Sequence, residues 1–244
     1  MRVIAGRFRS RVLDAPGGLA TRPTSDRLRE TLFNVLTPRI EGARFLDLYA
    51  GSGAVGIEAL SRGAAEVVFV ERAAPALAKL RANLEKLGIR GGTQVRPGTV
   101  AAFLKAPAGR PSPPKTSLDG APGQDTARGL FEVVFLDPPY EAVEEYQATL
   151  GVLGGVDLSP RSRNRDLGHP SPGGSCSPIS PEAGALGQPP ISPRSMNRGL
   201  RVLAEGGVVV AEHRRKDRLE ERYGELVRTR VLEQGDAALS FYER

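Results

Sequence analysis

The 244-residue sequence is poor in the residues that build metal centres and disulfides. It contains one cysteine, Cys176, and two histidines, His169 and His213. A single cysteine excludes an internal disulfide and a cysteine-built zinc site, and two histidines are too few for a histidine-rich metal site. We therefore expect a protein that uses no metal.

Long apolar runs are also missing. No run approaches the roughly 18 to 20 apolar residues that span a bilayer, which excludes a membrane-spanning role. The first seven residues carry positive charge but no apolar segment, so we expect no secretory signal there. With 40% hydrophobic residues, the chain still has enough apolar material for a core. We expect a globular, cytoplasmic protein.

The net charge of +6 is unevenly distributed. Residues 1–44 hold nine Lys or Arg against four Asp or Glu, whereas residues 131–153 hold five acidic residues and no basic one. A basic segment of this kind suits a phosphate backbone, although a general bias of the chain toward arginine explains it equally well.

Two segments have the wrong composition for a packed core. Residues 106–129 contain five Pro and four Gly, and residues 154–197 contain eight Pro, seven Gly and eight Ser. Proline removes a backbone donor and glycine costs entropy, so we predict that both are disordered insertions. Cys176 falls in the second, which argues against a catalytic role. A segment rich in Ser, Pro and Arg also suits RNA or a protein partner, and that alternative stays open.

The rest of the chain alternates short apolar runs with helical patterns. This alternation predicts an α/β fold with a mostly parallel sheet covered on both faces. The four residues 233–236 between the last two runs are too few for a crossover, so we expect an antiparallel C-terminal hairpin. The predicted strands are 45–49, 66–70, 93–96, 131–136, 206–211, 226–232 and 237–242, and the predicted helices are 54–62, 73–87, 100–105 and 141–150.

An N-terminal extension precedes this alternation. Residues 3–5 and 9–13 are able to pair as a small hairpin, and the sequence Thr24-Ser25-Asp26 offers N-caps for a helix over residues 27–36. We therefore divide the chain into an extension, residues 1–40, and a main domain, residues 41–244.

A glycine-rich loop follows the first strand of the predicted sheet. Gly51, Gly53 and Gly56 match G-x-G-x-x-G, and Glu71, 20 residues after Gly51, is placed to bind ribose hydroxyls. A dinucleotide enzyme, a methyltransferase and a tight structural turn all fit this pattern. Asp47 just before the loop would repel a pyrophosphate but suits a cationic ligand such as S-adenosylmethionine; alternatively it caps the turn.

The sequence Asp137-Pro138-Pro139-Tyr140 ends the fourth strand, at the same edge of the sheet. The prolines donate no amide hydrogens, which leaves the Asp137 carboxylate and the Pro138 carbonyl as rigid acceptors. Two acceptors suit the two hydrogens of an exocyclic amine, and Tyr140 offers a face on which a base stacks. The alternative is a proline-rich turn that merely closes the strand.

Four stretches together resemble one family. They are Arg2-Val3-Ile4-Ala5-Gly6, the segment from Arg22 to Leu36, the segment from Leu46 to Ala64, and Phe135-Leu136-Asp137-Pro138-Pro139-Tyr140. The chain closely resembles the bacterial 16S rRNA guanine-N2-methyltransferases of the RsmD type, which belong to the class I S-adenosylmethionine-dependent methyltransferases with a Rossmann-like, seven-stranded sheet. Many DNA and RNA enzymes share the D-P-P-Y motif, so methylation of DNA adenine or of another RNA is the alternative.

The resemblance implies S-adenosylmethionine as cofactor and 16S rRNA, free or within the small ribosomal subunit, as partner of a monomeric enzyme. It implies a catalytic group of Asp137, Pro138 and Tyr140, a cofactor group of Asp47, Ala50, Gly51, Gly53, Glu71, Arg72 and Thr99, and an RNA-contacting group of Arg7, Arg9, Arg11, Arg22, Arg27 and Arg29. Thr99 stands where the family has Asp or Asn for the adenine amine. A non-catalytic RNA-binding module and an NAD-dependent enzyme remain rivals of another class.

Overall fold

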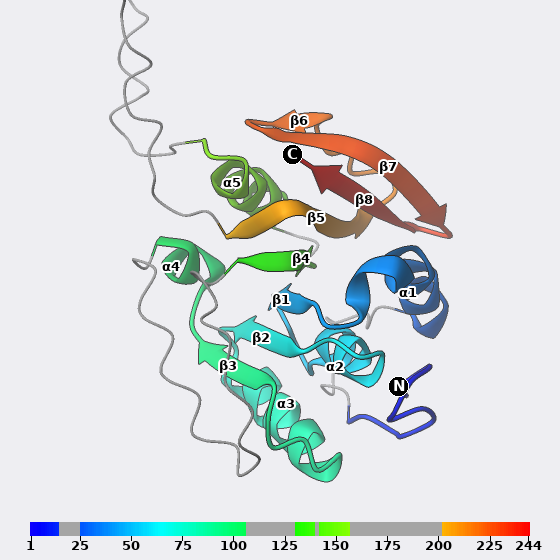
Figure 1. Ribbon diagram of the computed structural model, residues 1–244. Helices are drawn as coiled ribbons and strands as arrows, with labels where there is room; N and C mark the ends of the chain where they lie inside the picture. The colour runs from blue at the N-terminus through cyan, green and yellow to red at the C-terminus, as the bar shows by residue number, and fades with distance from the viewer. Residues whose placement is uncertain (15–24, 106–129, 140–141, 157–201) are drawn as a thin grey trace, which may run out of the picture.

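The computed structural model describes residues 1–14, 25–105, 130–139, 142–156 and 202–244 (Figure 1). The predicted insertions therefore lie outside the described residues, apart from Gly154, Gly155 and Val156. The helices are α1 (Asp26–Ile40), α2 (Ala54–Ser61), α3 (Ala74–Lys86), α4 (Val100–Lys105) and α5 (Val143–Leu153). The strands are β1 (Arg44–Leu48), β2 (Glu66–Glu71), β3 (Thr93–Pro97), β4 (Phe131–Leu136), β5 (Leu203–Arg214), β6 (Arg222–Tyr223), β7 (Leu226–Gln234) and β8 (Ala237–Glu243).

One sheet runs through the molecule in the order β3-β2-β1-β4-β5-β8-β7-β6. Strands β1 to β5 pair in parallel, and β8 lies antiparallel between β5 and β7. From β1, successive strands are added outward on one side, first β2 and then β3. The chain then returns to the other side of β1 to form β4, so the order of addition reverses between β1 and β4. Ligands in open α/β sheets bind at the carboxyl ends of the strands beside such a reversal, here the ends of β1 and β4.

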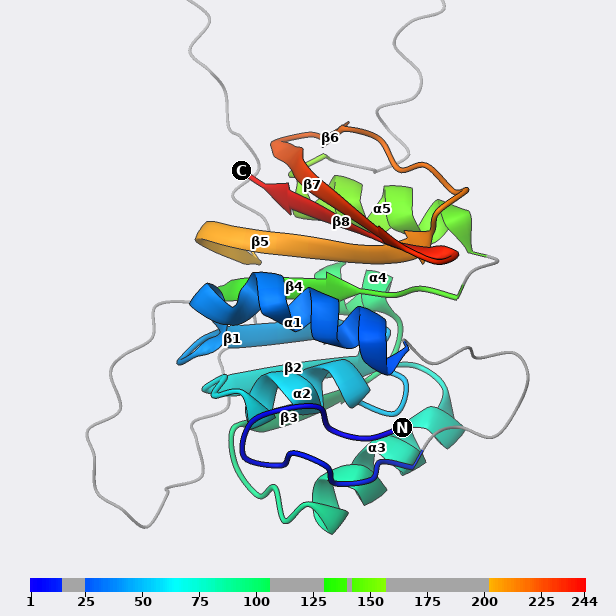
Figure 2. The same ribbon diagram turned by 90° about the vertical axis from the view of Figure 1, so that its right-hand side faces the viewer.

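Helices cover both faces of the sheet, as Figure 2 shows with α1 and α2 in front and α5 behind. The inward residues of α1, α2 and α3 pack on one face, where Phe45, Phe69 and Phe135 lie. Those of α4 and α5 pack on the other, against Leu46 and Val134. Successive strand residues point to opposite faces. Because helices cover both faces, residues of both orientations are buried in β1 and β4, and these strands are nearly continuous apolar runs in the sequence.

Helix α1 begins where its sequence predicts. The Ser25 hydroxyl accepts a hydrogen bond from the Leu28 amide at 3.1 Å and caps the helix. The helix runs on past the predicted end to Ile40, with Pro38 in its last turn. At its far end Arg39 pairs with Glu243 of β8 at 2.8 Å. The helix is therefore fixed at its C-terminal end to the antiparallel part of the sheet.

The structure confirms the α/β fold with antiparallel C-terminal strands and corrects one detail. The sheet has eight strands rather than seven, because the two-residue β6 pairs with β7. The predicted N-terminal hairpin (residues 1–14) forms, with an antiparallel bridge between Arg2 and Val12 and backbone hydrogen bonds between its arms. Among the described residues, no helix is long and apolar enough to cross a bilayer.

Candidate functional site

The glycine loop between β1 and α2 takes a conformation that few side chains allow. Tyr49, Gly51 and Gly53 have φ angles of 64°, 57° and 81°. A Cβ on Gly53 would lie 2.3 Å from the Leu80 side chain, so packing also requires glycine there. A Cβ on Gly51 would meet nothing within 4 Å, which leaves the backbone open to a ligand on that side.

Asp47 supplies the helix cap that Gly53 lacks. Gly53 has no side chain to cap α2, and Asp47 Oδ2 instead accepts a hydrogen bond from the Gly56 amide at 2.9 Å. Asp47 is 1% exposed. Burial raises the pKa of its carboxyl group to about 7; the hydrogen bond from Gly56 opposes this shift and the charge of Glu71 adds to it. The geometry therefore agrees with the capping alternative for Asp47, and it also places an acidic group beside the loop.

Glu71, at the end of β2, braces the same loop. Its Oε2 accepts from the Gly51 amide at 2.8 Å, and its Oε1 accepts from the Arg72 and Ala73 amides at 2.8 and 2.7 Å. A carboxylate has about four acceptor positions, so one stays available for a ribose hydroxyl. The predicted cofactor residue is thus also the residue that ties β2 to the glycine loop.

The other predicted cofactor residues are spread around the loop. Ala50 is buried and its amide donates to the Val70 carbonyl, whereas Arg72 is exposed and lies 3.9 Å from Glu145. Thr99 Oγ1 accepts a hydrogen bond from the Ala102 amide at 3.1 Å, so the hydroxyl caps the first turn of α4. Among the residues that the structure describes, no contact of Thr99 marks it as an adenine-binding residue, and that role stays a prediction.

The end of β4 presents the predicted acceptors. Asp137 is partly exposed and Pro138 is buried; Tyr140 lies outside the described residues. The Pro139 carbonyl accepts from the Ala142 amide at 2.8 Å. No donor within the described ranges reaches the Pro138 carbonyl. Although part of the residue is exposed, its carboxyl group is enclosed by protein, and this desolvation, then the charges of Glu212 and Asp47, raise the pKa of Asp137 well above its usual value.

Glu212 is a residue that the sequence reasoning missed. It lies on β5, and the pairing of Leu136 with Ala211 places it beside Asp137. The side chains of Asp47, Asp137 and Glu212 share the sheet face under α1, because Phe45, Phe135 and Val210 two positions earlier all do. Glu212 is 1% exposed. This edge of the sheet therefore gathers carboxylates, which suit cations and amines.

Tyr49 is a second residue that motif reasoning passed over. Its left-handed backbone is strained for a non-glycine residue, which is typical of functional sites. Its hydroxyl lies 3.1 Å from the Thr149 Oγ1 of α5, and burial, more than the nearby Glu145, raises its pKa. The ring is half-buried between the glycine loop and α5.

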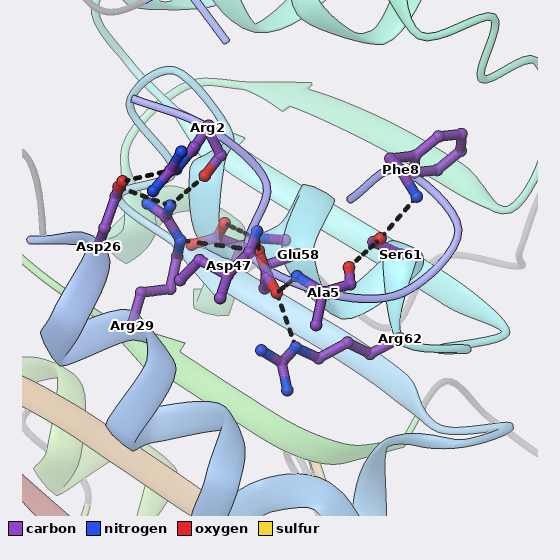
Figure 3. A network of polar contacts seen from close by, with 11 residues as sticks. Arg2, Ala5, Phe8, Asp26, Arg29, Asp47, Glu58, Ser61 and Arg62 are labelled. Atoms are coloured by element: carbon purple, nitrogen blue, oxygen red, sulfur yellow. Dashed lines mark hydrogen bonds and ion pairs between the residues drawn. The ribbon is translucent and has the colours of Figure 1, made fainter. Parts of the chain in front are cut away.

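One predicted RNA contact is wrong. Arg29 is 0% exposed and its guanidinium donates to the Arg2 carbonyl and to Asp26 Oδ1, at 2.5 and 2.9 Å (Figure 3). A side chain enclosed in this way does not reach a phosphate. The reason is helix periodicity: Arg29 lies at the spacing of Phe33, Leu36 and Ile40, on the buried face of α1.

The remaining predicted RNA contacts differ in position. Arg7, Arg9, Arg11 and Arg27 are exposed, while Arg22 lies outside the described residues. Arg7 lies over the ring of Phe8 and its amide donates to the carbonyl of Ser61, the last residue of α2. An eight-residue helix is about 12 Å long, so the hairpin tip lies that far from the glycine loop.

The sheet order, the glycine loop and the acidic edge define a class I methyltransferase. Comparisons with known proteins agree. A family model described as "Conserved hypothetical protein 95" matches residues 1–113. The "Putative rRNA methyltransferase YlbH" of Bacillus subtilis is 31% identical over 244 residues, which cover 100% of this chain and 99% of that protein. The "Ribosomal RNA small subunit methyltransferase D" of Haemophilus influenzae is 38% identical over 141 residues, or 57% of this chain and 64% of that protein.

A solved structure titled "Putative methyltransferase yhhF from Escherichia coli" superposes with a TM-score of 0.65 at 25% identity, over 100% of this chain and 97% of that one. The chain belongs to the RsmD-type family of class I S-adenosylmethionine-dependent methyltransferases.

The residues present fit this cofactor. Gly51 leaves open space over the loop backbone, and Glu71 keeps one acceptor position at the end of β2. Asp47 has no Lys or Arg partner within the described ranges, so a cationic group of S-adenosylmethionine would stabilise its ionised form. A dinucleotide carries negative phosphates, which this edge would repel.

Proposed function

We propose that this protein methylates the exocyclic N2 amine of one guanine in 16S rRNA, using S-adenosylmethionine. The observation that carries the proposal is the pair of acceptors at the end of β4, the Asp137 carboxylate and the Pro138 carbonyl. They lie at the same edge as the glycine loop, and they match the two hydrogens of an amine. The names of the relatives, rRNA and small-subunit rRNA methyltransferases, support the choice of RNA.

Asp137 and Pro138 have two tasks in this mechanism. By accepting both N–H hydrogens they hold the amine in one orientation, with its lone pair toward the reacting methyl, and orientation supplies most of the rate. When bound, the cofactor supplies an electrophilic methyl group on a sulfonium. The methylated amine carries one proton too many, which the Asp137 carboxylate accepts and then releases to solvent. A raised pKa makes this carboxylate a better base.

The target guanine enters such a site only when it is unpaired or flipped out of its helix. Tyr140 would stack on it, and the exposed Arg7, Arg9, Arg11 and Arg27 would contact phosphates of the surrounding RNA. Arg22 stays part of the proposed set on its sequence position alone. We propose a monomeric enzyme that acts in the cytoplasm.

The test compares methyl acceptors. Labelled S-adenosylmethionine is incubated with the protein and 16S rRNA, small ribosomal subunits or duplex DNA, and the product is digested and mapped by mass spectrometry. We expect a single N2-methylguanine in the ribosomal RNA. Methyl groups on DNA adenine or on another RNA would refute 16S rRNA as the substrate and favour the alternative acceptor. Binding of NAD in place of S-adenosylmethionine would refute methyl transfer as the activity.

A further inference from the structure

The N-terminal hairpin is held by the helices beside it as well as by its own backbone. It has one β-bridge, between Arg2 and Val12, and backbone hydrogen bonds between its two arms, but a two-stranded hairpin is at best marginally stable alone. Its second arm is held by α3, where Asn83 Oδ1 accepts from the Asp14 amide at 2.8 Å and Lys86 pairs with the Asp14 carboxylate at 3.1 Å. Figure 2 shows the hairpin lying between α2 and α3. Its first arm and its tip depend on α2.

Glu58 of α2 makes the first part of this attachment. The carboxylate is 0% exposed and accepts hydrogen bonds from two consecutive hairpin amides, Ile4 at 2.7 Å and Ala5 at 3.0 Å. It also accepts from Arg62 Nε at 2.7 Å. One carboxylate therefore holds the start of the hairpin and a side chain of its own helix.

Ser61, one turn further along α2, makes the second part. Its hydroxyl donates to the Ala5 carbonyl and accepts from the Phe8 amide, while its own carbonyl accepts from the Arg7 amide. A Cβ on Gly6 would fall 1.8 Å from that carbonyl, so only glycine allows so close an approach. The hairpin tip is thereby fixed at the C-terminal end of α2.

Arg29 connects this attachment to α1. Its Nη2 reaches the Arg2 carbonyl and Asp26, and its Nε lies 3.8 Å from Glu58 Oε2 (Figure 3). Neither Nε nor Nη1 has a hydrogen-bond partner in the described part of the chain. A buried guanidinium with two unmade hydrogen bonds is costly, and the charges of Glu58 and Asp26 are what retain it there.

We propose that Glu58 and Arg29 are positioning residues, whose buried ion pair fixes the N-terminal hairpin and α1 on α2 and so sets where the RNA-contacting arginines lie relative to the glycine loop. The inference rests on the proposed function. Helix α2 starts at the glycine loop and ends at Ser61. Through this pair, one helix positions both the cofactor loop and the surface that receives RNA.

The test is Glu58→Gln in the full-length protein, with RNA affinity measured by filter binding and cofactor affinity by calorimetry. Glutamine keeps the size of the side chain but loses the charge that balances Arg29. We expect RNA affinity to fall at least about tenfold, because several phosphate contacts are displaced together. Cofactor affinity should stay unchanged. Arg29→Lys retains the charge and should lose less RNA affinity than Arg29→Met.

Glu66→Gln is the matched control, since Glu66 pairs with Arg44 at 2.8 Å away from the hairpin. Hydrogen exchange provides a second measurement: the Ile4 and Ala5 amides should be protected in the parent protein and exposed in Glu58→Gln. A lower melting temperature with unchanged RNA affinity would overturn the proposal, because a purely structural pair does only that. A parent protein that binds RNA without methylating it would overturn the proposed function alone.

Discussion

Two irregular segments of this protein are held by buried carboxylates, yet the two carboxylates have different charged neighbours. Glu58, which holds the N-terminal hairpin, lies among Arg29, Arg62 and backbone amides. Asp47, which holds the glycine loop, has no cation in contact within the described ranges, and its pKa is raised to about 7. The first charge is balanced inside the fold. The second has no such balance, and we propose that the cationic groups of the cofactor supply it.

The largest effect is expected at the end of β4. Asp137→Ala removes an acceptor of the amine and the proton acceptor, so turnover should fall by about 10² to 10⁴-fold. Cofactor affinity should change little, because Asp137 is assigned to the amine. Steady-state methyl transfer measures turnover, and calorimetry measures cofactor affinity. Glu132→Gln on the same strand, exposed to solvent, is the control; near-normal turnover in Asp137→Ala would refute the mechanism.

Glu71→Ala should act on the cofactor instead. It removes three hydrogen bonds that brace the loop and an acceptor for ribose. We expect a loss of about 1.5 to 3 kcal/mol of cofactor binding free energy, as for a hydrogen bond to a charged group. Isothermal calorimetry with S-adenosylmethionine measures this. Equal affinity in the variant and the parent would show that neither the bracing of the loop nor the ribose acceptor contributes to cofactor binding.

The raised pKa of Asp47 predicts that the free energy of unfolding depends on pH and that a neutral residue at this position stabilises the fold. Burial raises this pKa, so the folded protein binds the proton more tightly than the unfolded chain, and stability falls as pH rises from about 4 to 7. Asp47→Asn keeps the acceptor for Gly56 and should raise the free energy of unfolding by about 1 to 3 kcal/mol at pH 8.

The effect of Asp47 on cofactor affinity should change with pH in the opposite direction from its effect on stability. The ionised carboxylate attracts a cation, so affinity in the parent protein should rise as pH increases through about 7 and level off above it. Asp47→Asn should bind more weakly and lose this dependence. Calorimetry at pH 6 and pH 8 checks the prediction. A parallel pH profile in the variant would mean that Asp47 only caps α2.

The smallest effect is expected at exposed arginines. Arg27→Gln should weaken RNA binding slightly and reduce the slope of log affinity against log salt by about 0.7, the value for one phosphate contact in a single strand. Arg39→Gln, on the same helix but paired with Glu243, is the control. An unchanged slope would take Arg27 out of the interface.

Much of the site was predictable because its signals are local. The apolar runs ending in Asp47 and in Asp137 locate β1 and β4, and topology then brings their ends to one edge. Burial on a helix was harder. Arg29 follows the spacing of Phe33 and Ile40, but an arginine in a basic segment reads as a surface charge until its partner is known.

That partner, Glu58, comes from a helix 29 residues away, and such a pairing depends on tertiary packing. Glu212 was missed for a similar reason. The apolar run suggested that its strand ends at Ala211, whereas β5 continues to Arg214 because β8 pairs with it over its whole second half. Pairing between strands extended an element beyond what its own residues indicate.

The most direct test of the central claim maps the methyl group itself. Ribosomal RNA from a strain that lacks this protein is incubated with the purified protein and labelled S-adenosylmethionine, in parallel with Asp137→Ala. Mass spectrometry should find one new N2-methylguanine in 16S rRNA with the parent protein and none with the variant. A methyl group on any other atom or nucleic acid, or equal transfer by Asp137→Ala, would contradict the account.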